Sequence, residues 1–516
     1  MLEIKDLTLT LRSDGRELVR DFSFTLHPGD RAVLIGEEGN GKSTLLQYLA
    51  DPARVEAYCE ASGRVLCRGS IGYLPQLPPP ALAGVPVCTL FEDTEWYEHT
   101  GTLAALGIPP ELLADTRPFG SFSGGEKVRL QLAALLMHRP DILLLDEPIN
   151  DLDIDTLRWM ERFLLGCRLP VLYISHDETL IERTANVILH MEQLIRKTQC
   201  RITVTRAPYR EYLARRAAGF EKQEQVAQKQ RDDHAKQMAR WQQIHDKVEH
   251  QQATITRQDP GGARLLKKKM HAVLSTGRRL ERQAEDFEDF PEYEEAILTR
   301  FPADIRLAKG KVVLDLFLER LTVDEGTPRL LAENIRLFAA GGVHIGITGA
   351  NGAGKSTLLE HIRRQLAPRR DITTGWMPQN YAAVLDIHKS AVEHLAARYT
   401  KAQITAARTH LGSMKFTHRE MLCPIGQLSG GQRAKLIFLQ MVLDRADVLL
   451  LDEPTRNFSP LSAPVVRSAL REFGGCIISV SHDRRYLRQV CDEVYELKKD
   501  GLHRIVLPAE EDFGNG

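Results

Sequence analysis

Two lysines, Lys42 and Lys355, each lie in a sequence of the form Gly-x-x-x-x-Gly-Lys-Ser. Each sequence follows an apolar segment (AVLIG, VHIGITG) and precedes a helical pattern (STLLQYLA, STLLEHIRRQL). A strand, a glycine-rich turn and a helix in this order form a P-loop, whose backbone N–H groups bind phosphate. We therefore expect both lysines to contact the β- and γ-phosphates of a nucleotide, and Ser43 and Ser356 to bind Mg²⁺.

Two carboxylates end an apolar run in each half of the chain, within the sequences ILLLDEP and VLLLDEP. Such runs predict buried parallel strands. We expect Asp146 and Asp452 to bind Mg²⁺ through water, and Glu147 and Glu453 to polarise the water that attacks the phosphate. A buried strand with a solvated acidic end is the alternative interpretation. A Ser-Gly-Gly sequence 24 residues before each glutamate disfavours it.

Serine and histidine residues recur at fixed distances from these glutamates. Ser123-Gly-Gly-Glu and Ser429-Gly-Gly-Gln open predicted helices, and amides at a helix N-terminus suit an anion. His176 and His482 each follow an apolar strand, 29 residues after the glutamate of their half. Taken singly, such a serine is a helix cap and such a histidine is structural. Their order and duplication favour a functional role.

The motifs occur twice in the same order, which makes the chain an internal repeat. The paired serines, glutamates and histidines are 306 residues apart, and the paired lysines are 313 residues apart. Gln76 and Gln379, which follow YLP and WMP, add a weaker pair. We expect an α/β protein with two P-loop nucleotide-binding domains in tandem, 1–213 and 305–516, joined by an α-helical hairpin linker, 214–304.

Composition limits the class of protein further. With 43% hydrophobic and 27% charged residues among 516, the chain is neither disordered nor collagen-like. Its formal net charge of -1 means that any contact with nucleic acid requires a local basic patch. Eight cysteines without a CxxC pair argue against zinc ribbons, iron–sulfur clusters and disulfide frameworks. The sequence shows neither a signal region nor a membrane-spanning apolar stretch, so we expect a cytoplasmic protein.

The segment between the two repeats predicts a helical hairpin. Residues 214–256 are polar all round and contain almost no Gly or Pro, QDPGG at 258–262 interrupts them, and 263–290 form a second helical run. Residues 254–282 carry eight basic and two acidic side chains, and seven acids follow in 285–295. A basic hairpin tip favours contact with RNA phosphates, and a solvated linker is the alternative. The candidate RNA contacts are Arg257, Arg264, Lys267, Lys268, Lys269, Arg278 and Arg279.

Together these residues resemble the nucleotide-binding domain of ATP-binding cassette (ABC) proteins, which pair head to tail around two ATP molecules. The resemblance implies one site between the first P-loop and the second Ser-Gly-Gly sequence, the signature, and a second site with these roles exchanged. It assigns Glu147, His176, Glu453 and His482 to catalysis, and Ser43, Asp146, Ser356 and Asp452 to Mg²⁺. It assigns to ATP binding Gly36, Gly39, Gly41, Lys42, Ser43, Thr44, Gln76, Ser123, Gly124, Gly125, Glu126, Gly349, Gly352, Gly354, Lys355, Ser356, Thr357, Gln379, Ser429, Gly430, Gly431 and Gln432.

Two cassettes joined by a charged helical linker resemble the ABC-F family of soluble translation factors. In that family the linker reaches from the ribosomal E site toward the peptidyl-transferase centre and the P-site tRNA. A Tyr-Ser-x-Tyr-like stretch precedes the linker there, and Tyr209-Arg-Glu-Tyr212 stands here. The resemblance implies a monomeric ATPase that uses ATP and Mg²⁺ and binds the ribosome, both rRNA and P-site tRNA, without a DNA partner. It would serve as a translation factor or as a ribosomal-protection protein in antibiotic resistance.

Several residues depart from the pattern of the family. After the first glutamate the family usually reads Pro-Thr-Asn-His-Leu-Asp, and this chain reads Pro-Ile-Asn-Asp-Leu-Asp. Ser459 stands in the second half where Asp153 stands in the first, so we expect asymmetric communication between the sites. Glu37 and Glu38 add negative charge to the first P-loop, and we expect them to weaken nucleotide binding there. No aromatic residue stands where adenine usually stacks, so ATP rather than GTP is implied by the family alone.

Two other functions of twin cassettes remain open. Some sugar importers fuse two cassettes as an ATPase subunit, but they usually lack a long charged hairpin and need membrane partners. DNA-associated members of the superfamily carry either zinc-binding CxxC pairs, which are absent here, or far longer coiled coils. Recovery with a membrane fraction would favour the importer.

Overall fold

The structure is a computed structural model that describes residues 1–92, 94, 96–149, 153–194, 199–254, 260–285, 287–290, 301–324 and 328–507. The chain folds as two compact units. One unit comprises Met1–Tyr209 and Glu294–Gly516, and the other comprises Arg210–Tyr293. Both P-loop halves therefore belong to one unit. The domain boundaries after residues 213 and 304 stay predictions.

A six-stranded sheet in the first half places the predicted phosphate-binding turn directly after its strand β3. The strand order is β5-β6-β7-β3-β8-β9, parallel from β5 to β8, with β9 antiparallel to β8. Strands β6 and β7 are buried throughout, because sheets of this kind are covered on both faces. The strands are β3 (Arg31–Ile35), β5 (Ile71–Leu74), β6 (Ile142–Asp146), β7 (Val171–Ile174), β8 (Val187–Leu194) and β9 (Gln199–Thr205).

A smaller antiparallel sheet completes the core of this half, in the order β2-β1-β4. Its strands are β1 (Leu2–Leu11), β2 (Glu17–Leu26) and β4 (Cys59–Cys67). Helix α1 (Lys42–Ala50), which follows the P-loop, buries Leu45, Leu46 and Leu49. These leucines belong to one apolar cluster with side chains of both sheets, so the core fixes the helix that carries the P-loop lysine.

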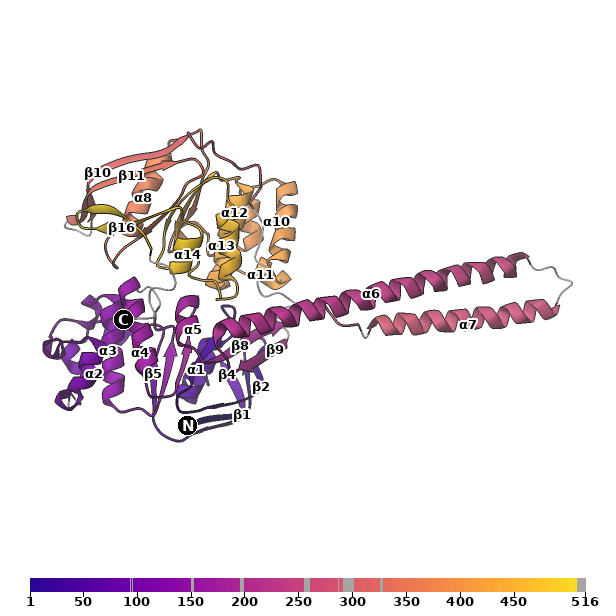
Figure 1. The fold of residues 1–516 in the computed structure, drawn as a ribbon, viewed down its shortest axis with the longest axis horizontal. Helices are drawn as coiled ribbons and strands as arrows, with labels where there is room; N and C mark the ends of the chain where they lie inside the picture. Colours follow the sequence, from indigo (N-terminus) through magenta and orange to yellow (C-terminus); the bar gives the residue numbers. More distant parts are fainter. Residues whose placement is uncertain are drawn as a thin grey trace. The chain divides into compact units, whose positions relative to one another are not determined.

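The second half repeats this arrangement, as the duplicated motifs predict (Figure 1). Its six-stranded sheet has the order β13-β14-β15-β12-β16-β17, and β10 pairs with β11 in an antiparallel ribbon. The strands are β10 (Val312–Asp324), β11 (Pro328–Ala340), β12 (His344–Thr348), β13 (Thr374–Met377), β14 (Val448–Asp452), β15 (Cys476–Val480), β16 (Glu493–Lys498) and β17 (Gly501–Ile505).

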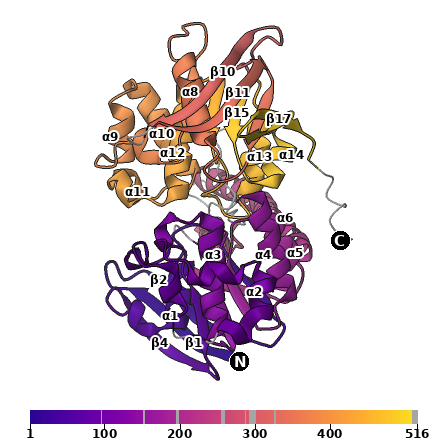
Figure 2. The same ribbon diagram turned by 90° about the vertical axis from the view of Figure 1, so that its left-hand side faces the viewer.

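Equivalent helices carry or support the functional motifs in the two halves. The first half has α2 (Thr100–Leu106), α3 (Gly124–Met137), α4 (Ile154–Gly166) and α5 (Glu178–Thr184). The second has α8 (Lys355–Leu366), α9 (Ala391–Ala396), α10 (Lys401–Ser413), α11 (His418–Leu422), α12 (Gly430–Leu443), α13 (Ala463–Arg471) and α14 (Arg484–Gln489). Figure 2 shows α9, α10, α11 and α12 grouped on one side of the second half.

Short 3₁₀ helices connect several of these elements. They are η1 (Pro52–Arg54), η2 (Pro80–Leu82), η3 (Val87–Leu90), η4 (Trp96–His99), η5 (Pro110–Ala114), η6 (Phe119–Ser121), η7 (Tyr381–Ala383) and η8 (Ile425–Gln427). Six of them begin at or just after a proline of the chain, whose fixed φ suits the first turn of a helix.

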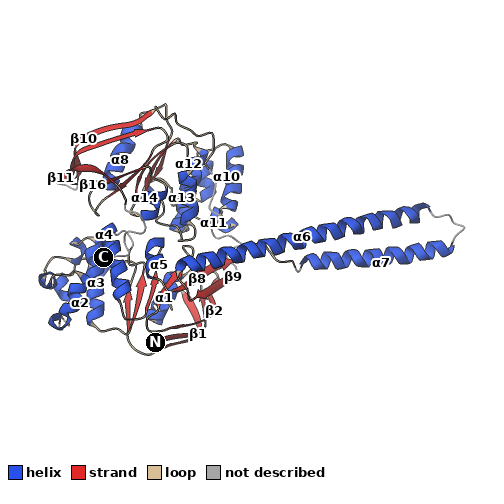
Figure 3. Ribbon diagram, in the orientation of Figure 1, coloured by secondary structure: helices blue, strands red, loops and turns tan. Residues whose placement is uncertain are grey.

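The second unit contains the predicted helical hairpin, formed by α6 (Tyr209–Thr254) and α7 (Pro260–Glu285) (Figure 3). Polar side chains of α6 bind backbone carbonyl groups of the other arm. Trp241 Nε1 donates to Val273 O at 2.7 Å, and His234 Nε2 lies 3.0 Å from Leu280 O. Gly277 lies against the Trp241 ring, where a larger residue would not fit. These contacts explain how two polar helices remain paired.

Helix α7 ends earlier than the sequence pattern predicts. We expected the helical run to reach residue 290, whereas 287–290 are not helical. The acids in this stretch oppose the negative end of the helix dipole. Arg231 Nη1 and Gln223 Nε2 of α6 instead donate to the carbonyl oxygens of Glu288 and Asp289, each at 3.0 Å. Within the described residues, none of the helices is long and apolar enough to cross a membrane.

Candidate functional site

The two P-loops hold their lysines in the same way. Lys42 is the first residue of α1. Its Nζ donates to the carbonyl oxygens of Gly36 and Glu37, at 2.8 and 2.9 Å. Lys355 is the first residue of α8. Its Nζ donates to the carbonyl oxygens of Gly349 and Ala350 in the second loop, both at 2.9 Å. Gly41 and Gly354 precede them with φ of 97°, a conformation that favours glycine. Thr44 and Thr357 lie in the first turns of the same helices.

Oxygen ligands suitable for Mg²⁺ meet at the end of β6. Ser43 Oγ donates to Asp146 Oδ1 at 3.0 Å. Burial raises the pKa of Asp146 to about 6, and repulsion by Glu147 adds to this effect, although the Ser43 hydrogen bond opposes it. Hydroxyl and carboxylate oxygens are ligands that Mg²⁺ prefers, so the residues present fit the ion.

Glu147 is held between two polar side chains of its own half. Gln76 Nε2 donates to one carboxylate oxygen at 2.8 Å, and His176 Nε2 lies 3.2 Å from the other. Burial opposes the charge of Glu147, but the His176 ring and Lys42 outweigh burial and lower its pKa to about 2. Its backbone has φ of 47°, a strained value that is typical of functional residues. Glu147 is therefore an ionised carboxylate fixed in one orientation.

The equivalent Glu453 lies in a different environment, although its φ of 52° is similar. It accepts hydrogen bonds from Ser481 Oγ and His482 N, both at 3.4 Å, and His482 Nε2 is 3.9 Å away. Burial, followed by repulsion from Asp452, raises the pKa of Glu453 to about 8. Burial lowers the pKa of His482 to about 4. At neutral pH the two equivalent glutamates therefore differ in protonation.

The two signatures begin α3 and α12, where Ser123 and Ser429 are the N-caps. Each serine forms a capping box with the residue three positions later, Glu126 or Gln432. Ser123 Oγ donates to Glu126 Oε2 at 2.7 Å. The first signature thus carries a carboxylate where the second carries an uncharged amide.

Each P-loop lies near the signature of the other half. At the first P-loop, the backbone N–H of Gly431 donates to the Glu38 carboxylate. At the second P-loop, Gly124 lines a cavity of about 460 Å³ together with Lys355, Ser356, Gln379 and other residues of that loop. This volume lies in the range of small-molecule sites, which is about 300–1,000 Å³. The structure therefore brings together members of both predicted composite sites.

The four predicted catalytic residues line one further cavity, of about 110 Å³, between the halves. Glu147 and His176 come from the first half, and Glu453 and His482 from the second. His176 Nδ1 lies 3.0 Å from the carbonyl oxygen of Phe458. Among the described residues, the buried Nδ1 of His482 has no hydrogen-bond partner. The two histidines are thus held differently.

The sequence analysis missed a set of ion pairs that join the two halves. Arg467 and Arg485 bind Glu178, and Arg485 also binds Glu182. Arg484 binds Glu161, which also binds Arg183 of its own half at 2.8 Å. The sequence carries one signal that could have predicted these ion pairs, namely opposite charges at positions 306 residues apart in the repeat. Glu161 is equivalent to Arg467, and Glu178 is equivalent to Arg484.

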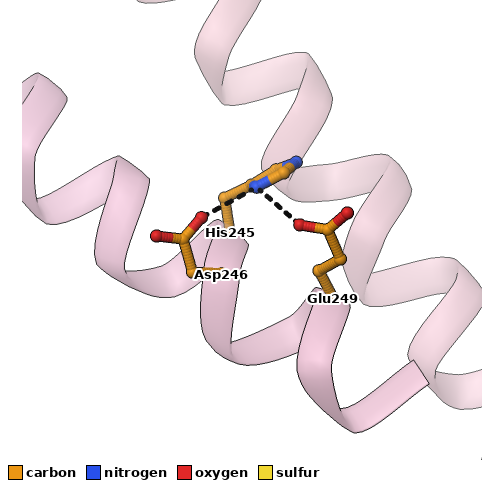
Figure 4. Close-up of side chains that lie close together, drawn as sticks. All are labelled: His245, Asp246 and Glu249. Atoms are coloured by element: carbon orange, nitrogen blue, oxygen red, sulfur yellow. Dashed lines mark hydrogen bonds and ion pairs between the residues drawn. The ribbon is translucent and has the colours of Figure 1, made fainter. Parts of the chain in front are cut away.

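The candidate RNA contacts lie on α7 of the hairpin, except Arg257, which is outside the described residues. The other six, Arg264, Lys267, Lys268, Lys269, Arg278 and Arg279, are all exposed. On α6, His245 lies near Asp246 and Glu249, at 3.4 and 3.8 Å (Figure 4). Their ligand-type atoms lie within 4.8 Å of one another. Ion pairing along one helix accounts for this cluster.

Comparisons with known proteins agree with this geometry. The sequence model of the ABC transporter family matches residues 19–150 and 332–456. The chain is 29% identical to the putative ATP-binding protein YdiF of Bacillus subtilis, over 81% of this chain and 61% of that protein. It is 28% identical to the probable ATP-binding protein YheS of Escherichia coli strain K12, over 95% and 77%. It is 30% identical to ATP-binding cassette sub-family F member 3 of Homo sapiens, over 78% and 53%.

Solved structures of twin-cassette proteins share the fold. An archaeal ribosome recycling factor, aABCE1, determined in complex with a ribosomal stalk protein, has a TM-score of 0.56 and 18% identity. The alignment covers 97% of this chain and 90% of that chain. RNase-L Inhibitor has a TM-score of 0.54 and 17% identity, over 97% and 91%.

The chain is a protein with two ATP-binding cassettes, one in each half. It belongs to the ABC-F subfamily of twin-cassette proteins. The family matches support ATP hydrolysis by these cassettes. The chain spans 61% of the length of the Bacillus subtilis relative and 53% of that of the human relative.

Proposed function

We propose that this chain is a cytoplasmic ATPase that binds the ribosome through its helical hairpin. The observation that carries the proposal is the combination of two composite sites in one chain with a hairpin on which the six described candidate RNA contacts are all exposed. Support comes from the names of similar proteins. The solved neighbours include a ribosome recycling factor and a ribosome-bound twin-cassette protein. The relative from Homo sapiens carries the name of sub-family F.

The residues of each composite site would have separate roles in ATP hydrolysis. ATP supplies the phosphoryl group, and Mg²⁺ neutralises its charge. Lys42 and Lys355 would contact the phosphates, and the signature amides would approach them from the opposite half. Glu147, oriented by Gln76 and His176, would hold the attacking water and take its proton.

The hairpin would carry the contact with RNA. The six exposed candidate contacts on α7 can replace counterions along a phosphate backbone. In the proposed arrangement the chain enters the ribosomal E site, and the hairpin acts on the peptidyl-transferase centre and the P-site tRNA. The chain would act as a monomer, either as a translation factor or as a ribosomal-protection protein in antibiotic resistance.

Ribosome co-sedimentation tests this function. The variant Glu147→Gln, Glu453→Gln is expected to pellet with 70S ribosomes in ATP and not in ADP. Changing Lys267, Lys268 and Lys269 to Glu is expected to weaken pelleting. The matched control changes the exposed Lys222, Lys229 and Lys236 of α6 to Glu, which alters the net charge equally and is expected to weaken pelleting less.

The outcomes of pelleting and of drug-tolerance measurements separate the possibilities. If both lysine variants lose ribosome pelleting equally, the contact depends only on net charge, and the specific role of α7 is contradicted. An absence of pelleting in every state, from protein that binds ATP, would contradict the ribosomal function and favour the importer subunit. Drug tolerance that depends on Lys267–Lys269 would favour the protective role, and unchanged tolerance would exclude that role for these lysines.

A further inference from the structure

The two P-loops differ in charge at two equivalent positions. Glu37 and Glu38 of the first loop stand where Ala350 and Asn351 stand in the second, 313 residues later. The first loop thus has two carboxylates beside the place expected for a triphosphate, whereas the second has none at these positions. Like charges within a few ångströms repel strongly, so this difference bears directly on nucleotide binding.

The Glu38 carboxylate is bound to the signature of the other half. It accepts a hydrogen bond from the backbone N–H of Gly431, in the first turn of α12. A Cβ atom at Gly430 would lie 3.0 Å from both oxygens of this carboxylate. The signature amides are the groups that, by resemblance, bind the ATP phosphate at the first site. The Glu38 carboxylate of the opposite P-loop thus binds the Gly431 amide in the way expected of a phosphate group.

The other carboxylate of the first P-loop also faces α12. Glu37 Oε1 lies 3.7 Å from Nζ of Lys435, a buried lysine on α12, so both carboxylates of the loop face this helix. Little space remains between these two carboxylates and the second signature, in a cavity of about 30 Å³. The cavity at the second P-loop has about 460 Å³. The volume at the second P-loop lies in the range of small-molecule sites.

We infer that Glu38 is a built-in anion that holds the second signature against the first P-loop and that ATP must displace to bind there. The first composite site is therefore the weaker and regulatory one, and the second site binds ATP first. This inference rests on the proposed ATP binding, and it assigns a different role to each of the two sites.

Nucleotide titration of the full chain tests the inference. A fluorescent ATP analogue is expected to bind the wild type in two phases, with the weaker phase lost in Lys42→Ala and the tighter phase lost in Lys355→Ala. Glu38→Asn, which copies the second loop, is expected to strengthen the weaker phase about tenfold or more, because ATP no longer has to displace a hydrogen bond to a charged group. The reciprocal Asn351→Glu is expected to weaken the tighter phase.

The control is Glu37→Ala, which copies the neighbouring residue of the second loop. It removes one negative charge but leaves the Gly431 contact intact, so its effect is expected to be smaller than that of Glu38→Asn. Equal effects would reduce the role of Glu38 to general charge and overturn the inference. Unchanged affinities in Glu38→Asn would overturn it as well.

Amide hydrogen exchange keeps this test separate from the proposed function. Without nucleotide, the peptide around Gly431 is expected to exchange faster in Glu38→Asn than in the wild type. Equal exchange would overturn the proposed contact, whatever the chain binds. If the wild type binds no ATP analogue at either site, the proposed function fails, while the exchange experiment still decides whether Glu38 holds the signature.

Discussion

Arg467 Nη1 donates a hydrogen bond to Glu178 Oε1 at 2.7 Å, and only 4% of each side chain is exposed. The two residues belong to different halves, because Glu178 begins α5 and Arg467 lies on α13. Gln489 Oε1 accepts a second hydrogen bond from Arg467 at 2.7 Å. A buried ion pair needs such additional partners to offset the loss of hydration.

A second pair repeats this one with the same distribution of charge between the halves. Arg484 binds Glu161, and both side chains are buried. Glu161 is equivalent to Arg467 and Glu178 to Arg484 in the internal repeat. The acids therefore lie in the first half and the arginines in the second. Two first halves paired in this way would place acid against acid, so the charges favour pairing of unlike halves.

Removing one partner of the buried pair is expected to destabilise the fold. Arg467→Ala leaves the buried charge of Glu178 with fewer partners to offset its lost hydration. The free energy of unfolding is therefore expected to fall by about 3–5 kcal/mol. Urea denaturation measures it. The control is Arg320→Ala, which breaks an exposed pair with Glu333 and is expected to cost less than about 1 kcal/mol. Equal losses would show that Arg467 contributes no more than a surface charge.

Reversing charges tests the preference for unlike halves. Changing Glu161 and Glu178 to Arg places like charges opposite Arg484 and Arg467, and like-charge contacts cost several kcal/mol. In the proposed composite sites both halves contribute to each nucleotide, so ATP turnover is expected to fall at least about tenfold. Changing Arg467 and Arg484 to Glu in the same protein is expected to restore a large part of it. Failure of this fourfold variant to recover, although it folds, would contradict the role of the charges.

The sequence predicted the elements that carry chemistry, because a P-loop or a buried strand leaves a local pattern. The strand before Lys42, the helix after it and the strand ending at Asp146 all occur in the structure. Contacts between the halves leave no local pattern, since they depend on how two distant surfaces meet. The contact of Glu38 with Gly431 therefore came only from the structure. The roles of the individual site residues stay predictions.

The different environments of the two predicted catalytic glutamates, Glu147 and Glu453, predict unequal effects of mutation. Glu147 has a pKa of about 2 and Glu453 one of about 8, so at neutral pH Gln removes a charge from the first and hardly alters the charge of the second. Glu147→Gln is therefore expected to lower phosphate release more than Glu453→Gln. The double variant is expected to bind ATP but to hydrolyse it at least about a hundredfold more slowly. Turnover of the double variant at the wild-type rate would contradict the assignment of both residues.

Two glycines of the hairpin offer a matched test of its packing. A Cβ at Gly277 would lie 2.8 Å from the Trp241 ring, whereas Gly219 on α6 has nothing within 4 Å of that position. Gly277→Ala is expected to destabilise the pairing of α6 and α7 by about 1–3 kcal/mol, because the ring is held by its hydrogen bond to Val273. Gly219→Ala is expected to stabilise α6 by about 0.5–1 kcal/mol. Amide hydrogen exchange of the hairpin measures both effects, and equal protection in the two variants would show that the Trp241 contact does not hold the arms together.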